Sequence, residues 1–120
     1  MSPPASGTPP PRLTLSKIVS GDATVVTCSG FLTAPYAPEL KAYVREILPD
    51  IKRIVLDLSQ VVFMDSSGLG TIVALYISAK AARSELQVVH LSKQIRELFQ
   101  VTRVLSLFEC GGEYIMMKLP

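Results

Sequence analysis

The strongest constraint on the fold of this chain is a short apolar segment that is followed closely by a long apolar helix pattern. Residues Arg53–Leu58 are nearly continuously apolar except for Asp57, which is typical of a strand covered on both faces of a sheet. A helix pattern then runs from about Ser66 to Ala82, and small residues widen its apolar stripe, so we expect a largely buried helix. The stripe consists of Leu69, Ile72, Val73, Tyr76 and Ile77.

Strand and helix patterns also precede this unit. Leu13–Val19 and Ala23–Ser29 flank the turn sequence Ser20-Gly21-Asp22, which predicts an antiparallel hairpin whose second strand ends at Gly30. A helix pattern follows and ends at Pro49, because proline is not tolerated in a helix interior, whereas the prolines before it fit ahead of the helix or in its first turn. The inner face of this helix is predicted to hold Tyr36, Leu40, Tyr43, Val44 and Ile47.

The same alternation continues after the long helix. Leu86–Leu91 is predicted as a strand, and Ser92 can cap a third helix, whose inner face would hold Ile95, Leu98 and Phe99. Val104–Phe108 is a further apolar strand pattern, and the alternating segment Glu113–Leu119 also predicts a strand.

Taken together, the patterns predict an α/β domain with the element order β-β-α-β-α-β-α-β. Helices between strands indicate parallel pairing, so we expect a mixed, mostly parallel sheet to which the N-terminal hairpin adds an antiparallel pair. Residues 1–11 are rich in proline, serine and glycine, and such a segment buries too little surface to order itself. We therefore expect a flexible leader at 1–11 and one domain at 12–120.

Composition excludes several classes of protein. The chain has 120 residues, 48% of them hydrophobic, which is enough for one core without disulfides or metals. The net charge is +2, and the basic residues form no cluster of the kind that binds nucleic acid. No apolar run reaches the ~18 residues of a membrane span. The two cysteines, Cys28 and Cys110, are predicted to stay unpaired in a reducing cytoplasm.

The most informative segment is Phe63–Gly70, which lies between the buried strand and the buried helix. Open α/β folds place their sites at such βα turns. Asp65 and Ser66 suit a helix start because their oxygens can accept the unpaired N–H groups there, but glycine inside a helix costs roughly 0.8–1 kcal/mol. The two glycines therefore indicate a close approach to this backbone or a tight turn, and the positive helix end would tolerate a phosphate. The plain alternative is an ordinary capped turn whose glycines only allow helix and sheet to pack.

Enzymatic interpretations of these residues fail on their spacing. A nucleophile elbow needs glycine two residues before the serine, where this chain has Met64. No Walker loop or pair of metal-spaced His or Cys residues occurs, and the single histidine, His90, lies at a strand end. Asp57 and Asp65 could imitate a carboxylate pair, but nothing in the sequence fixes their separation. We therefore predict no catalytic residues, and the chain is not expected to be an enzyme.

The run Ile54–Gly70, and above all Asp65-Ser66-Ser67-Gly68 within it, resembles the signature of the STAS superfamily and, within it, the soluble bacterial anti-sigma factor antagonists. The resemblance implies a cytoplasmic STAS domain that takes part in transcription regulation by partner switching. Ser66 would be phosphorylated by an anti-sigma factor that is itself a serine kinase, and Ser67 would be structural. The unphosphorylated protein would bind the anti-sigma factor and free a sigma factor, and a serine phosphatase would reset the switch.

The resemblance also implies which residues bind the partner and what is absent. ATP belongs to the kinase, so no cofactor or metal is expected on this chain, and neither direct nucleic-acid binding nor membrane insertion is expected. The partner-binding residues would be Asp65, Ser66, Ser67, Gly68, Leu69, Gly70, Phe31 and Thr33.

The chain departs from the family pattern at one part of this site. Many antagonists carry Gly-Glu-Leu-Asp after the second strand, and Phe31 and Thr33 stand at its acidic positions in a loop that is expected near Ser66. The rival interpretation is a cytosolic STAS subunit of a lipid or anion transport system, which would use the same turn as a fixed docking surface. A third possibility is a sensor of a small molecule or nucleotide. The retained Asp-Ser-Ser-Gly run favours the phosphorylation switch over both alternatives.

Overall fold

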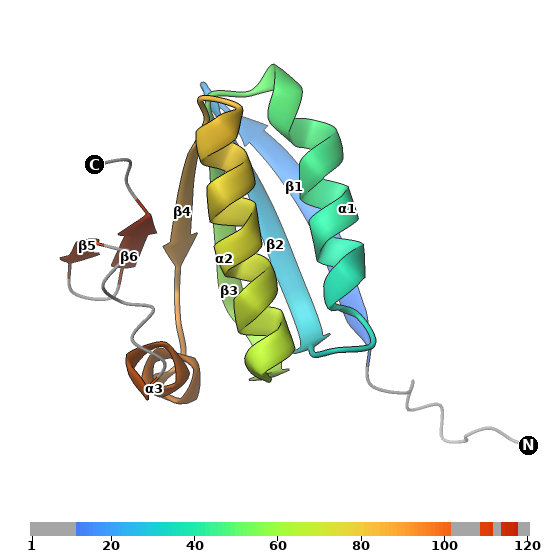
Figure 1. Ribbon diagram of the computed structural model, residues 1–120, viewed down its shortest axis with the longest axis vertical. Coiled ribbons are helices and arrows are strands. Elements are labelled where there is room, and N and C mark those ends of the chain that lie inside the picture. Colours follow the sequence, from blue (N-terminus) through green and yellow to red (C-terminus); the bar gives the residue numbers. More distant parts are fainter. Residues whose placement is uncertain (1–11, 102–108, 112–113, 118–120) are drawn as a thin grey trace, which may run out of the picture.

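Six strands and three α-helices, with one short 3-10 helix, make up the described part of the chain in a computed structural model (Figure 1). The structure describes residues 12–101, 109–111 and 114–117. The elements are β1 (Leu13–Ser20), β2 (Ala23–Leu32), α1 (Ala37–Ile47), η1 (Leu48–Asp50), β3 (Arg53–Met64), α2 (Ser66–Ala81), β4 (Glu85–Val89), α3 (Lys93–Val101), β5 (Glu109–Gly111) and β6 (Tyr114–Met117).

The strands form one sheet in the order β1-β2-β3-β4-β6-β5. β2, β3 and β4 pair in parallel and β1 pairs antiparallel with β2, so the predicted mixed α/β sheet with its N-terminal hairpin is confirmed. The C-terminal hairpin extends the sheet beyond β4, since β6 pairs antiparallel with both β4 and β5. The predicted strand at Glu113–Leu119 is confirmed by β6, whereas the leader at 1–11 and the strand at Val104–Phe108 lie outside the described residues.

The helices begin at the residues that local chemistry predicts. Pro38 lies in the first turn of α1, and Asp65 is the N-cap of α2. The hydroxyl of Ser92 accepts a hydrogen bond from the Ile95 N–H at 3.2 Å, which satisfies one of the unpaired donors at the start of α3.

α1 and α2 lie side by side across one face of the sheet (Figure 1). Burial alternates along β3, where Ile54, Leu56 and Leu58 are buried against the helices while the residues between them are only partly covered. The prediction that Arg53–Leu58 is covered on both faces was therefore wrong. α2 is also less buried than expected, because Ile77 is 60% exposed on the side that faces away from the sheet.

β2 continues past Gly30, where the sequence predicted its end. Gly30 has a φ of 100°, and the register of β2 against β3 shifts on both sides of it, each time because β3 has one residue more than β2, so the bulges lie on β3 opposite this part of β2. A Cβ at this position would clash with the Arg12 carbonyl oxygen, which accepts a hydrogen bond from the Phe31 N–H at 3.0 Å. The strand resumes after this kink and carries Phe31 and Leu32 toward the end of β3.

Cys28 is a free, fully buried thiol on β2. Burial, and then the negative charge of Asp57, raise the pKa of the Cys28 thiol from 9.0 to about 12. No helix in the described ranges is long and apolar enough to cross a membrane.

Candidate functional site: the turn between strand β3 and helix α2

The turn from β3 into α2, residues Asp65–Gly70, lies at the carboxyl end of the parallel strands. We refer to it as the βα turn. Ser66 is the first residue of α2, and the end of β2 lies beside it because Leu32 pairs with Met64. The parallel pairing therefore brings the segment after β2, with Thr33 and Ala34, next to the start of α2. This juxtaposition confirms the expectation that the two segments are close.

The carboxylate of Asp65 joins these two segments. Its Oδ1 accepts a hydrogen bond from the Gly68 N–H at 3.0 Å, which caps α2. Its Oδ2 accepts a hydrogen bond from the Ala34 N–H at 3.1 Å, which holds the segment after β2. The sequence predicted the cap, but no local signal predicts the second bond because Ala34 lies 31 residues earlier in the chain.

The two glycines of the βα turn have different surroundings. Gly68 is buried, and a Cβ there would clash with the carbonyl oxygen of Leu32 and crowd the side chain of Met64. This is the close backbone approach that the sequence predicted. Gly70 is exposed, and a Cβ there would meet no atom within 4 Å, so packing does not explain it.

Ser66 and Ser67 are both exposed at the start of α2. Neither hydroxyl forms a hydrogen bond within the described ranges, and the backbone N–H groups of both residues are also unpaired there. The structural role expected for Ser67 therefore has no hydrogen bond of its side chain to support it within the described residues. Two open N–H groups and the positive end of a helix favour a negatively charged group at this point.

The other predicted site residues divide into an accessible and a buried set. Asp65, Phe31 and Thr33 are partly exposed, whereas Gly68 and Leu69 are buried, so these two can shape the turn but offer little surface to a partner. The Thr33 carbonyl accepts hydrogen bonds from the Tyr36 and Ala37 N–H groups, which closes the turn into α1.

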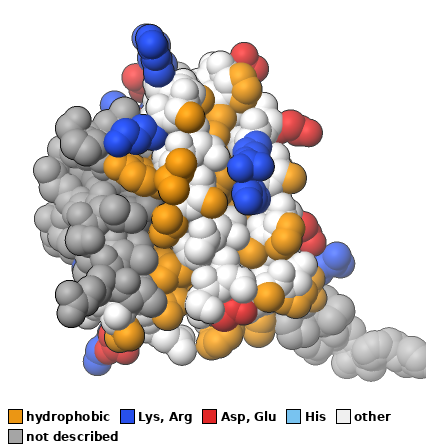
Figure 2. Space-filling view, viewed as in Figure 1, with side chains coloured by type: hydrophobic (Ala, Val, Ile, Leu, Met, Phe, Trp, Pro, Cys, Tyr) orange, Lys and Arg blue, Asp and Glu red, His pale blue; other side chains and the backbone are white. Residues whose placement is uncertain are grey.

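An apolar surface beside the βα turn was missed by sequence reasoning. Phe31 and Phe63 are register neighbours on β2 and β3, with ring centroids 6.2 Å apart. Phe63 is 42% exposed and Val62 is 66% exposed. Their apolar character was visible in the sequence, but their exposure depends on the irregular end of β3. Hydrophobic side chains are also visible along α2 in the space-filling view (Figure 2).

Asp57 and Asp65 do not act as a pair, because each is engaged separately. Asp57 Oδ1 accepts a hydrogen bond from the Ser59 N–H at 2.9 Å and lies 3.1 Å from His90 Nδ1. Partial burial opposes ionisation, but the hydrogen bonds from Ser59 and His90 and the charge of His90 outweigh it and lower the pKa of Asp57. No group of three His, Cys, Asp or Glu side chains suited to a metal ion occurs in the part of the chain that the structure describes.

Comparison with known proteins agrees with this architecture. The anti-sigma-B factor antagonist of Listeria monocytogenes is 35% identical over 83 residues, which cover 68% of this chain and 72% of that protein. The structure of an anti-sigma factor antagonist from Mycobacterium paratuberculosis has a TM-score of 0.73 at 25% identity and covers 82% of this chain and 85% of its own.

Two structures of SpoIIAA share the fold at lower sequence identity. The anti-sigma factor antagonist SpoIIAA in its unphosphorylated form has a TM-score of 0.60 at 21% identity, over 73% of this chain and 81% of its own. The Bacillus SpoIIAA in the phosphorylated form has a TM-score of 0.61 at 21% identity, over 75% and 82%. The family model described as "Mlab, STAS domain" matches residues 17–109, which is most of the chain. The chain therefore belongs to the STAS domain family.

Proposed function

We propose that this chain is an anti-sigma factor antagonist whose binding to an anti-sigma factor is switched off by phosphorylation of Ser66. The observation that carries the proposal is an exposed serine hydroxyl, without a hydrogen-bond partner in the described residues, at the first position of α2. The names of its relatives support the antagonist assignment. The chain then acts as a binding protein rather than an enzyme, and a serine kinase and a phosphatase act on it.

Electrostatics explain how one phosphate could control binding and leave the fold intact. A phosphoserine adds about −1.5 to −2 charges. Within the domain this charge lies at the positive end of α2, which is worth roughly 0.3–1 kcal/mol. At an interface the same charge must be desolvated against a surface shaped for a hydroxyl, and an unpaired buried charge costs several kcal/mol. The loss of binding therefore exceeds the gain within the helix.

Phosphorylation mapping tests the acceptor. The protein is incubated with its cognate anti-sigma factor kinase and ATP, and the modified peptide is identified by mass spectrometry. We expect phosphate on Ser66 in the parent and in Ser67→Ala, and none in Ser66→Ala. Phosphate on Ser67 with Ser66 unmodified would refute the assignment.

Binding measurements test the switch. Ser66→Ala is expected to bind the anti-sigma factor constitutively, whereas Ser66→Asp should bind at least about tenfold more weakly, a loss of about 1.4 kcal/mol. Ser92→Asp is the matched control, because it adds the same charge at the N-cap of α3, where aspartate also caps well. All three variants should keep the parent's circular dichroism. If Ser66→Asp binds as tightly as the parent, the charge mechanism is wrong and the transport-subunit interpretation is favoured.

A further inference from the structure

A groove lies at the opposite end of the sheet from the βα turn. It is enclosed by β1, β2, the end of α1 and η1, and the structure divides it into two adjoining cavities of about 240 and 310 Å³. Both cavities are lined by Val19, Thr24, Asp50 and Ile51. These volumes are at or below the lower end of the range for drug-sized ligands, so any ligand here is small.

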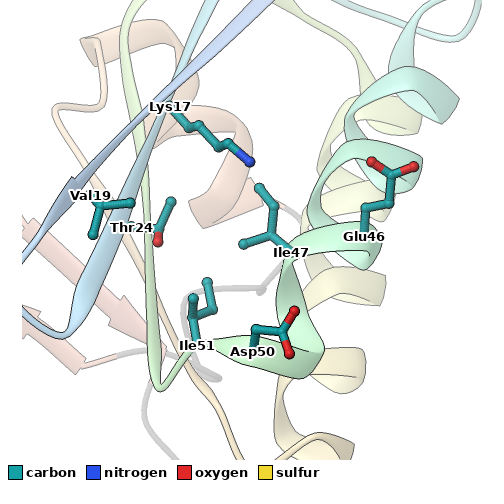
Figure 3. Close-up of a pocket in the computed structure, with 7 residues that line it drawn as sticks. All are labelled: Lys17, Val19, Thr24, Glu46, Ile47, Asp50 and Ile51. Carbon is teal, nitrogen blue, oxygen red and sulfur yellow. The ribbon is translucent and has the colours of Figure 1, made fainter.

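The hydroxyl group of Thr24 opens onto this groove. Thr24 is only 2% exposed, and its hydroxyl forms no hydrogen bond in the described part of the chain. In the close-up its oxygen faces Ile51 across the cavity (Figure 3). No buried side-chain oxygen in the described residues lacks a hydrogen bond, so the Thr24 oxygen must be reached from the groove, where it can meet a polar atom that enters the cavity.

Charged side chains of both signs, Lys17, Glu46 and Asp50, line the first cavity without forming ion pairs among the described residues. Lys17 projects from β1 toward α1 (Figure 3), and Asp50 on η1 lines the cavity. Neither of these side chains, nor Glu46 on α1, forms an ion pair within the described residues. The first cavity therefore presents a free ammonium group on one side and free carboxylates on the other, and the second cavity is lined in addition by Lys52 and by Asp22, which pairs with Arg53.

Apolar side chains complete the lining. Ile47 and Ile51 line the helix side of the cavity, and Val19 lines its strand side while remaining 71% exposed. A ligand with an aliphatic part would cover Val19 and remove this apolar surface from water.

We propose that this groove binds a small aliphatic zwitterion of the α-amino acid type. The ligand carboxylate would lie between the Lys17 ammonium and the Thr24 hydroxyl, which would donate to it. The ligand ammonium would lie against Asp50, and its alkyl group against Val19 and Ile51. Because β3 separates the groove from Ser66 by its whole length, roughly 35 Å for twelve residues, this site is independent of the proposed phosphorylation switch.

Titration of the full chain followed by ¹H–¹⁵N NMR tests the proposal with three probes of similar shape. L-leucine carries both charges, 4-methylpentanoate lacks the ammonium group, and 3-methylbutylamine lacks the carboxylate. We expect L-leucine to shift the amide signals of Thr24 and Ile51 with a dissociation constant on the order of 1 mM, and both analogues to bind at least about tenfold more weakly. An absence of shifts with L-leucine, or equal binding of either analogue, would overturn the proposal.

Variants identify the groups that bind. Thr24→Val, which keeps the shape and strand preference of threonine, and Asp50→Asn should each weaken L-leucine binding about tenfold, as expected for the loss of a hydrogen bond to a charged group. Glu39→Gln is the matched control at the other end of α1 and should leave binding unchanged. Ser66→Asp should also leave it unchanged, which separates this test from that of the proposed switch. Binding that survives both Thr24→Val and Asp50→Asn would place the ligand elsewhere and refute the site.

Discussion

At the scale of single residues, Asp65 and Ser66 have separate roles: Asp65 holds the βα turn, and Ser66 offers at its surface a hydroxyl that is free among the described residues. Asp65 forms both hydrogen bonds that hold the βα turn, one to Gly68 within α2 and one to Ala34 after β2. Ser66 forms none within the described residues, so a modification of its hydroxyl breaks no bond that supports the turn. This division lets the proposed phosphate change the surface while the turn keeps its shape.

The two glycines of the βα turn provide a matched pair of substitutions. Gly68→Ala forces a Cβ against the Leu32 carbonyl, so we expect the free energy of unfolding to fall by about 1–3 kcal/mol. Gly70→Ala meets open space in a helix and should raise the free energy of unfolding by about 0.5–1 kcal/mol. Urea denaturation measures both values. Equal effects of the two substitutions would show that the close approach to Gly68 does not constrain the turn.

At the scale of elements, the existence of strands and helices was predictable, but their exposed faces were not. Strand and helix patterns, caps and turn residues identified β1–β4 and α1–α3 correctly. Arg53 and Asp57 do lie on the less covered face of β3, but apolar Val55 lies between them, and few polar residues mark the open face of α2. The partial exposure of Val55 and the exposure of Ile77 therefore follow from the arrangement of the two helices on one face of the sheet.

In the candidate site too, local sequence patterns predicted some features and not others. The capping role of Asp65 and the exposure of Ser66 follow from local helix chemistry. The bond from Asp65 to Ala34 and the pairing of Phe31 with Phe63 depend on the parallel register of β2 and β3 and on the bulges of β3 opposite Cys28–Phe31. Contacts between segments about 30 residues apart leave no local pattern, so a single sequence does not specify them.

The pairing of Asp57 with His90 connects β3 to the end of β4 and should make stability depend on acid. The pKa of Asp57 is lower in the folded protein than its ordinary value of 3.8, so the ionised carboxylate favours folding. The stability that the ionised Asp57 carboxylate contributes is complete above the pKa of aspartate in the unfolded chain, about 3.9. It is lost as the pH falls through the lower pKa of Asp57 in the folded protein. We therefore expect the free energy of unfolding of Asp57→Asn to fall less steeply than that of the parent below about pH 4.

Urea denaturation at a series of pH values measures this difference. Glu39→Gln is the control, because Glu39 is exposed on α1 and forms no ion pair or side-chain hydrogen bond within the described ranges. It should follow the acid dependence of the parent. The prediction fails if Asp57→Asn also follows the parent curve throughout.

At the scale of the whole molecule, exposed apolar side chains occur toward both ends of the sheet. Val62 and Phe63 lie at the carboxyl end of β3 beside the βα turn, and Ile18 and Val19 lie toward the hairpin end of β1. Exposed apolar groups that adjoin a binding site can be covered when the partner docks, and those far from it remain in water. The fold thus separates a surface suited to the anti-sigma factor from the groove that is proposed to take a small ligand.

Val62 and Ile18 allow this separation to be tested, since both are β-branched strand residues with nearly equal exposure, 66% and 69%. If the proposed anti-sigma factor docks on the βα turn, it buries Val62, and Val62→Ser should weaken binding about tenfold, as expected for an interface residue worth about 1–2 kcal/mol. Ile18→Ser should leave that affinity unchanged. Both substitutions replace a side chain already exposed to water, so their free energies of unfolding should stay within about 0.5 kcal/mol of the parent. Calorimetric titration of the unphosphorylated protein with the anti-sigma factor measures the affinities. Equal loss of binding in the two variants would mean that the partner does not dock preferentially beside Ser66.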